Sequence, residues 1–219
     1  MNLSLRNRFL IPMLALIILG MGISTTISYY KSKSALEEAI TGQINQQVDS
    51  TLKVMVSWLR DRKLDISNWS QQSVFGIALE TSFVGKAARK SANLQLEKFK
   101  EDYNHYENLF IANASGDIVG SSDTSLIGNL KVKDHMSFKQ AMKGNVYVSK
   151  VMKSTTREAP PVFVISSPIM EKEIVVGAFM GVIEVNTFSQ QYIDPIKVCD
   201  TGYAFIYDES GNIIAHPDK

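Results

Sequence analysis

One acidic side chain, Glu184, interrupts an otherwise apolar stretch that runs from Ile174 to Val185. A carboxylate in such a strand is costly to bury unless it has a partner. Glu184 could face a pocket and bind a ligand amine or a cation, or it could lie at an exposed strand end or in an internal ion pair. It is the most suggestive single residue for binding chemistry in the sequence.

A histidine and three aromatic residues could complete a small-molecule site. His135 could donate a hydrogen bond to a ligand carboxylate, or it could lie in the first turn of a helix without a further role. Phe138, Tyr147 and Phe163 could form the walls, because such sites are mostly apolar with a few polar groups. The alternative for these three is core packing, which is the commoner role of aromatic residues in a sheet.

Several other functions lack their sequence signals. The chain contains no nucleophile elbow, no zinc-protease motif, no phosphate-binding loop and no dinucleotide-binding glycine pattern. Cys199 is the only cysteine, which excludes an internal disulfide and a multi-cysteine metal site. The formal net charge of +1 provides no field that would attract nucleic acid. We therefore predict no enzymatic activity, no catalytic residue, no metal or cofactor and no nucleic-acid partner.

The N-terminal segment, which comes before these residues, predicts a membrane anchor. Residues 9–30 contain no charged side chain and are numerous enough to span a bilayer. A cleaved signal peptide is the alternative, but the sequence after Gly22 is a poor cleavage site. Arg6 and Arg8 favour a cytoplasmic tail of residues 1–8, so the bulk of the chain is expected on the outer side of the membrane.

Residues 35–105 are expected to form a long stalk helix and a second helix from about Lys86. Apolar side chains recur along the first helix at a four–three spacing, and Arg62 fills the one expected position that is not apolar. The helix could continue unbroken from the anchor, because no proline lies between Pro12 and Pro160. The seam could pack on the protein's own domain, or pair with a second chain in a homodimer, or do both on different turns. Its apolar members are Val48, Leu52, Met55, Leu59, Ile66 and Trp69.

After Tyr106 the sequence changes to short apolar runs separated by polar turns. A short helix is expected from Asp134 to Gly144. The pattern predicts an α+β module over residues 106–192, with an antiparallel five-stranded sheet and flanking helices. Its strands are expected at residues 110–113, 118–121, 145–151, 162–167 and 174–185.

A β-hairpin pattern in this module recurs near the end of the chain. Phe110–Asp123 and Phe205–Asp218 each consist of an apolar run, a turn with Ser-Gly followed by Asp or Asn, and a second apolar run. A repeat of this kind indicates two related modules. The second module is expected to begin at residue 193 and to be incomplete at residue 219.

A set of motifs in this order links the chain to a known family. The motifs are Ser115-Gly-Asp117, Asp134 with Phe138 and Ala141 before Gly144, Ser166-Ser-Pro-Ile169, Gly177 and Gly181, Thr201-Gly-Tyr-Ala204 and His216-Pro-Asp218. Together with the anchor and the long helix, they resemble the double Cache family of extracytoplasmic sensor domains, which have a PAS-like fold. The resemblance covers residues 35–219. It implies that residues 106–192 form a membrane-distal module, which usually holds the ligand, and that residues 193–219 start a membrane-proximal module.

The resemblance also implies which positions contact the ligand. Many members that recognise amino acids have an Arg-x-Trp-Tyr pattern on the short helix, a Tyr-x-Asp on the next strand and an acid on the last strand. The arginine that would bind a carboxylate is missing here, and so is the tryptophan. A smaller or less charged ligand, or a cation on Glu184, is then as plausible as an amino acid. The corresponding positions here are Asp134, His135, Ser137, Phe138, Tyr147, Ser149 and Glu184.

These observations predict the small-ligand sensing part of a transmembrane receptor, most like a methyl-accepting chemotaxis receptor. The alternatives are the sensor half of a histidine kinase or a diguanylate cyclase, and an anchored binding protein without a signalling role. The expected partners are a small-molecule ligand, the membrane and a second copy of the chain. Ligand binding would favour one of two arrangements of the module and so shift the long helix.

Overall fold

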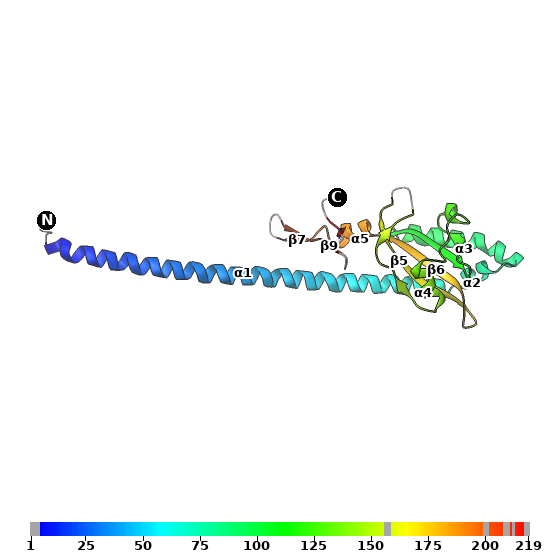
Figure 1. Ribbon diagram of the computed structural model, residues 1–219, viewed down its shortest axis with the longest axis horizontal. Coiled ribbons are helices and arrows are strands. Elements are labelled where there is room, and N and C mark those ends of the chain that lie inside the picture. The colour runs from blue at the N-terminus through cyan, green and yellow to red at the C-terminus, as the bar shows by residue number, and fades with distance from the viewer. Residues whose placement is uncertain (1–4, 156–158, 199–201, 208–210, 212, 217–219) are drawn as a thin grey trace. The chain divides into compact units, whose positions relative to one another are not determined.

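The computed structural model describes residues 5–155, 159–198, 202–207, 211 and 213–216 (Figure 1). The chain divides into two units, Met1–Leu52 and Lys53–Lys219. The first unit contains the N-terminal part of a long helix, α1. The second contains the C-terminal part of that helix and all the strands.

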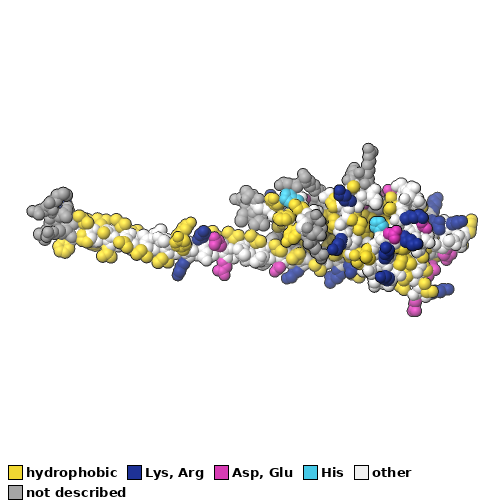
Figure 2. Space-filling model, in the orientation of Figure 1, with side chains coloured by type: hydrophobic (Ala, Val, Ile, Leu, Met, Phe, Trp, Pro, Cys, Tyr) yellow, Lys and Arg dark blue, Asp and Glu magenta, His cyan; other side chains and the backbone are white. Residues whose placement is uncertain are grey.

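Helix α1 extends without a break from Leu5 to Ser70 and contains 66 residues. Its only proline, Pro12, lies near the start, and so nothing interrupts the helix further along. The helix contains an apolar window with a mean hydropathy of 2.1, so it is able to cross a membrane by length and composition. Figure 2 shows this window as a nearly continuous hydrophobic surface. The prediction of an unbroken helix is confirmed.

Six strands form the central antiparallel sheet of the second unit. The order is β2-β1-β6-β5-β3, and β4 also pairs with β5. The two long strands pair along their whole length, from Val162 opposite Glu184 to Glu171 opposite Ile174. The predicted α+β class with an antiparallel sheet is confirmed. The strands are β1 (Tyr106–Asn113), β2 (Ile118–Ser121), β3 (Tyr147–Val148), β4 (Met152–Lys153), β5 (Pro161–Glu171) and β6 (Ile174–Glu184).

The sheet differs from the prediction at one edge, where two short strands replace the single strand expected at residues 145–151. The interruption lies at Ser149. Its backbone N–H donates to the Val164 carbonyl at 2.8 Å, and its Oγ accepts from the Val164 N–H at 2.9 Å. A serine side chain that replaces a backbone acceptor ends the regular ladder. The sheet therefore has six strands instead of five.

Four further α-helices and one 3-10 turn lie around the sheet in the described part of the chain. Helix α3 is the predicted second helix, but it begins earlier because Ser82 caps it: the Ser82 Oγ accepts from the Gly85 N–H at 3.0 Å. Helix α2 was not predicted. The elements are α2 (Ser73–Leu79), α3 (Phe83–Asp102), η1 (Thr124–Leu126), α4 (Met136–Met142) and α5 (Val185–Tyr192).

Both copies of the predicted hairpin form antiparallel strand pairs. In the first, β1 pairs with β2, and Gly116 allows the turn because its φ is 81°, a conformation that favours glycine. In the second, β9 (Ile206–Tyr207) pairs with β10 (Ile213–Ala215). The turn residues 208–210 and 212, and the end of the copy at Pro217 and Asp218, lie outside the described residues. Before this hairpin, β7 (Lys197–Val198) pairs with β8 (Gly202–Tyr203).

One face of the sheet, which we call the α1 face, packs against the end of α1 and against α2 and α3. Gly181 allows this close packing, because a Cβ atom there would lie 2.7 Å from the Ile66 Cδ1 atom. The predicted seam of α1 therefore packs on the protein's own domain at its C-terminal turns. The fully buried side chains of the α1 face include Ile66, Phe75, Leu96, Leu109, Ile111, Ile165, Ile169, Phe179 and Ile183.

The opposite face, which we call the α4 face, is covered by α4 and by the segment that precedes it. Its buried cluster is separate from that of the α1 face. Several of its members are small, so one short helix and the segment before it are enough to close it. The members are Phe110, Ala112, Ile118, Val132, Phe138, Ala141, Val164, Ala178 and Met180.

Candidate functional site

Helix α4 is held on the sheet by one aromatic side chain and one buried hydrogen bond. Phe138 is 4% exposed and belongs to the cluster of the α4 face. The Ser166 Oγ on β5 donates to the Ser137 carbonyl of α4 at 2.8 Å, and both serines are buried. Ala141, also on α4, is fully buried in the same cluster, so this helix of seven residues lies close to the sheet.

Glu184 lies on the same face as Phe138. It is the last residue of β6 and pairs with Val162, and strand alternation places its side chain with those of Met180 and Val182. It also precedes the first turn of α5 as its N-cap residue, without a side-chain capping bond. The side chain is half-buried and forms no ion pair or hydrogen bond with any described residue. The strand-end position was one of the two structural alternatives, and it leaves this carboxylate able to bind a ligand.

Tyr147 and Ser149 lie at the edge of the sheet. Tyr147 pairs with Ser166 and is half-buried, so strand alternation places it on the α4 face as well. The Ser149 Oγ donates to the Lys150 carbonyl at 2.7 Å and accepts from the Val164 N–H. Ser149 therefore supports the sheet edge, whereas Tyr147 is available to line a site.

The structure does not bring the other three predicted residues into the same cluster. Asp134 has a side chain that is 99% exposed and forms an ion pair with Lys139 at 3.7 Å. His135 is the exposed N-cap residue of α4, and its side chain makes no capping bond. Phe163 packs on the α1 face, beside Trp58. Phe138, Tyr147 and Glu184 thus share one face, and Phe163 lies on the other.

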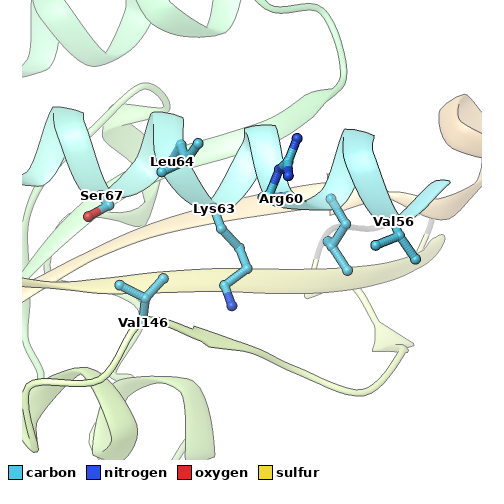
Figure 3. A pocket seen from close by; sticks show the side chains of 7 residues that line it. Val56, Arg60, Lys63, Leu64, Ser67 and Val146 are labelled. Carbon is cyan, nitrogen blue, oxygen red and sulfur yellow. The ribbon is translucent and has the colours of Figure 1, made fainter. Parts of the chain in front are cut away.

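A groove of about 430 Å³ lies elsewhere, between α1 and the segment before β3 (Figure 3). In Figure 3, Lys63 extends from α1 in the direction of Val146, whereas Arg60 points away from it. Neither cation forms an ion pair with a described acid. None of the predicted site residues lines this groove. Its lining consists of Val56, Leu59, Arg60, Lys63, Leu64, Ser67 and Val146.

A cluster of polar and aromatic residues beside the C-terminal half of α1 was missed by the sequence analysis. The Arg62 Nε lies 2.9 Å from the Asp65 Oδ2, as an ion pair without hydrogen-bond alignment, and the Arg62 Nη1 lies 3.5 Å from the His105 Nε2. The Tyr106 hydroxyl is buried and has no hydrogen-bond partner among the described residues. The signal that could have found this cluster is Arg62 itself, the one charged residue in an apolar seam.

The surroundings change the pKa values of this cluster. Burial, with a smaller contribution from Arg62, lowers the pKa of His105 to about 4. Burial raises the pKa of Tyr106, and it also raises the pKa of Asp65 although Arg62 acts in the opposite direction. His105 is therefore neutral near pH 7. Among the described residues, no group of three histidine, cysteine, aspartate or glutamate side chains is placed to hold a metal ion.

Comparison with known proteins gives one family and a consistent set of structures. A family model described as the Cache domain matches residues 32–219. Among curated proteins, none matches the sequence significantly.

Three of the similar solved structures are bacterial ligand-binding or sensor domains. The ligand-binding domain of the Pseudomonas fluorescens chemoreceptor CtaA, in complex with L-isoleucine, has a TM-score of 0.61 and 21% identity, over 86% of this chain and 73% of that one. The sensor domain of the V. cholerae histidine kinase DctB has a TM-score of 0.59 and 17% identity, over 71% of this chain and 60% of that one. The ligand-binding domain of the Pseudomonas aeruginosa amino acid chemoreceptor PctC, in complex with GABA, has a TM-score of 0.59 and 18% identity, over 77% and 71%.

These identities are low, so the structures support the fold and do not transfer a ligand. The chain spans less than two thirds of the length of the DctB sensor domain.

Proposed function

The chain belongs to the Cache domain family, and from this membership we propose that it is the small-ligand sensing module of a transmembrane receptor. The family match, which extends over residues 32–219, is the observation that carries the proposal. The unbroken helix α1 supports it, because the same helix includes the candidate membrane span and ends in the core of the sensing module.

We place the ligand site on the α4 face, between the sheet and α4. Phe138, Tyr147 and Glu184 lie on this face, and Glu184 has no described partner that would neutralise it. Phe138 now fills the space under α4. A ligand there would displace α4 or the Phe138 ring, and the two arrangements of α4 would be the two states of the sensor.

The chemistry of this face favours a ligand with an amine or another cationic group. The described residues place a carboxylate and a tyrosine hydroxyl on the α4 face but no arginine or lysine in its cluster. A ligand carboxylate would therefore lack the charged partner that binds it best. An amine would find the Glu184 carboxylate at the end of β6, on the face that also contains Phe138 and Tyr147.

The ligand proposal can be tested by thermal unfolding of the full chain in detergent micelles with amines, amino acids, organic acids and purines. A ligand that binds only the folded state stabilises it by about 2.7 kcal/mol at a hundredfold excess over its Kd. Glu184→Gln should remove the stabilisation by amines. Glu173→Gln, an exposed carboxylate in the turn between β5 and β6, is the matched control and should keep it.

Strong stabilisation by amino acids with free carboxylates, retained in Glu184→Gln and in His135→Ala, would contradict the proposed ligand chemistry. No stabilisation by any compound of the four classes would count against the sensing function itself.

For the receptor class, we propose a chemoreceptor of the methyl-accepting type in the bacterial plasma membrane, with residues 1–8 in the cytoplasm and residues 106–192 as the distal module. Several of the similar structures are chemoreceptor domains, which supports this class over a histidine kinase. The sensor domain of the kinase DctB has a similar TM-score, so a kinase is the second candidate. An alkaline phosphatase fusion after Lys219 should be active in bacteria, and a β-galactosidase fusion at the same position inactive. The opposite pattern would reverse the orientation.

We also propose that two copies pair through the stalk part of α1. Val48 and Leu52 belong to the predicted seam, and each is 49% exposed. An apolar seam at this spacing is typical of paired helices. Leu52→Lys should lower the dimer fraction measured by light scattering in detergent, whereas Lys53→Leu, a change on the neighbouring side of the helix, should not. A chain that is monomeric before any substitution would contradict the pairing.

A further inference from the structure

We propose that Trp58 couples α1 to α5, so that a movement of α5 is passed to α1. We call the contact of Trp58 with Phe188 and Tyr192 the joint. The inference rests on the proposed function, because it names the residues that pass a movement within the sensing unit to the helix with the membrane span. It uses neither the α4 face nor any residue of the proposed ligand site.

The first observation is a cluster of three mutually tilted rings between α1 and α5. The Trp58 ring lies 5.0 Å from that of Phe188 and 6.1 Å from that of Tyr192, measured between centroids. The Phe188 and Tyr192 rings are 5.1 Å apart. These two residues are four positions apart on α5, so they occupy the same face of that helix. Aromatic pairs at these distances stabilise beyond the apolar area that they bury.

The second observation is that Trp58 also contacts the start of the sheet. Its ring lies 6.3 Å from that of Phe163 on β5 and 5.7 Å from that of His105, which precedes β1. The Trp58 indole therefore contacts β5 and the residue before β1 as well as α5. A shift of α5 relative to the sheet must then either move this indole or break its ring contacts with Phe188 and Tyr192.

The third observation is the position of α5 in the chain. It starts directly after β6, the longest central strand together with β5, and it contacts β5. It also contacts β10 of the second hairpin. Helix α5 is therefore the segment that connects the sheet of the first module to the beginning of the second, and Trp58 is where this connection meets α1.

Arg62 explains how Trp58 is kept in place. Its guanidinium lies over the Trp58 ring at 5.7 Å and over the Tyr103 ring at 5.9 Å. Its Nε also lies 2.9 Å from the Oδ2 of Asp65, one turn further along α1. A cation over an aromatic face is attracted to the ring. The one charged residue in the apolar seam is thus a positioning residue for the joint.

The joint can be tested by hydrogen exchange of the full chain in detergent micelles. Trp58→Leu should accelerate exchange of the α5 amides by about tenfold, because the loss of aromatic contacts lowers the local opening free energy. The amides of α3 should change by less than about twofold, because Phe99 of α3 stacks on Trp69, and the substitution leaves this contact in place. Phe83→Ala, at a residue that is 88% exposed, is the control and should leave α5 unchanged.

Two results would overturn the joint. One is an α5 that exchanges at the wild-type rate in Trp58→Leu. The other is equal acceleration in α5 and α3, which would make Trp58 an ordinary core residue. Arg62→Met should accelerate α5 less than Trp58→Leu does, and Arg62→Lys less again, because lysine keeps the charge but not the planar group.

A reciprocal experiment reads the same contact from α5. The chain has two tryptophans, so Trp69→Phe leaves Trp58 as the only tryptophan, whose emission can be excited selectively over that of the tyrosines. In that background, Phe188→Ala with Tyr192→Ala should shift the Trp58 emission to longer wavelength and raise its quenching by acrylamide. Phe205→Ala with Tyr207→Ala removes an exposed aromatic pair of the second hairpin and should change neither value. Unchanged emission and quenching in the α5 variant would overturn the joint.

Both experiments are done without a ligand. A negative result for the joint therefore does not contradict the sensing proposal, and a ligand screen without a hit does not contradict the joint.

Discussion

The two faces of the sheet are closed in different ways. The α1 face is covered by three helices and filled with large side chains such as Phe75 and Phe179, which are fully buried. The α4 face is covered by one helix of seven residues and the segment before it, and it contains several alanines. Dense packing permits few alternative arrangements, so the α1 face is suited to hold the sheet rigidly on α1. The α4 face is held by fewer contacts and can change with a ligand.

Two consecutive residues on β5 show the same difference at the level of single hydrogen bonds. Ser166 donates to the Ser137 carbonyl of α4 at 2.8 Å, whereas the Ser167 Oγ lies 3.0 Å from the Ser70 Oγ at the end of α1. Both are buried. Because side chains alternate along a strand, neighbouring serines bind opposite layers. One strand therefore connects the helix that would contact the ligand with the helix that includes the membrane span.

The largest expected effect breaks the α1 face. Phe179→Ala should lower the free energy of unfolding by about 3 to 5 kcal/mol, because Phe179 is fully buried between Phe75 and Trp69 and its removal leaves a cavity. Phe138→Ala on the α4 face should cost no more than the lower end of that range, since the short helix α4 can move into the space. Urea unfolding of the full chain in detergent micelles measures both.

Equal costs for Phe179→Ala and Phe138→Ala would contradict the difference between the faces. A second comparison uses a smaller change in side-chain volume. Phe138→Leu should lower the free energy of unfolding less than Phe179→Leu, because α4 can move into the space that is left.

The two serines give a smaller and more local test. Ser166→Ala and Ser167→Ala should each cost about 1 kcal/mol, the usual net contribution of one hydrogen bond. Their hydrogen-exchange patterns should differ, because Ser166→Ala loosens α4 and Ser167→Ala loosens the end of α1. If both variants accelerated exchange in the same segments, the two layers would not be independent.

The pH dependence of stability should also differ between the two faces, because each has one histidine beside it. His105 beside the α1 face has a pKa lowered from 6.5 to about 4 by burial. The unfolded chain therefore takes up this proton first, and stability should fall as the pH decreases from about 6.5 to about 4. Asp65, whose pKa is raised, acts in the opposite direction in the acidic range, so the test is a difference between variants.

The variant His105→Gln should lose less stability than the wild type between pH 7 and pH 4.5, measured as the melting temperature at both pH values. His135→Gln replaces an exposed histidine before α4 and should behave as the wild type does. A wild-type loss that persists fully in His105→Gln would show that other groups cause it.

The smallest expected effect lies at the surface of α4. Asp134→Asn removes an ion pair with Lys139 that is 3.7 Å long and solvent-exposed. Such pairs contribute little to stability, so the melting temperature should stay within error, and so should ligand-induced stabilisation. A large change in either quantity would mean that Asp134 takes part in the site.

Most of the fold could be predicted from local patterns. The uncharged N-terminal run, the absence of proline over a long range and the Ser-Gly turns gave the long helix, both hairpins and the class of the sheet. The errors were local as well. Helix α2 is short and lacks a strong periodic signal, and the strand around Ser149 is divided because a side chain replaces a backbone acceptor.

The candidate site was predicted less well. Phe138, Tyr147 and Glu184 were expected together and lie on one face, but Phe163 was expected with them and lies on the other. Neighbouring positions on a strand point in opposite directions, and the sequence does not fix which direction meets which helix. The aromatic cluster around Trp58 was missed, because its other members come from segments that are distant in the chain. They are His105 before β1, Phe163 on β5, and Phe188 and Tyr192 on α5.

The sequence by itself determined the properties that depend on neighbours along the chain: the membrane-compatible helix, the turns, the strands and the motifs that mark the family. Only the tertiary structure decided which residues meet. It placed Arg62 over Trp58 and beside His105, separated Phe163 from Phe138, and left the Glu184 carboxylate without a described partner. The physical reason is that hydrogen bonding and side-chain periodicity act over a few residues, whereas burial and charge pairing depend on packing between distant segments.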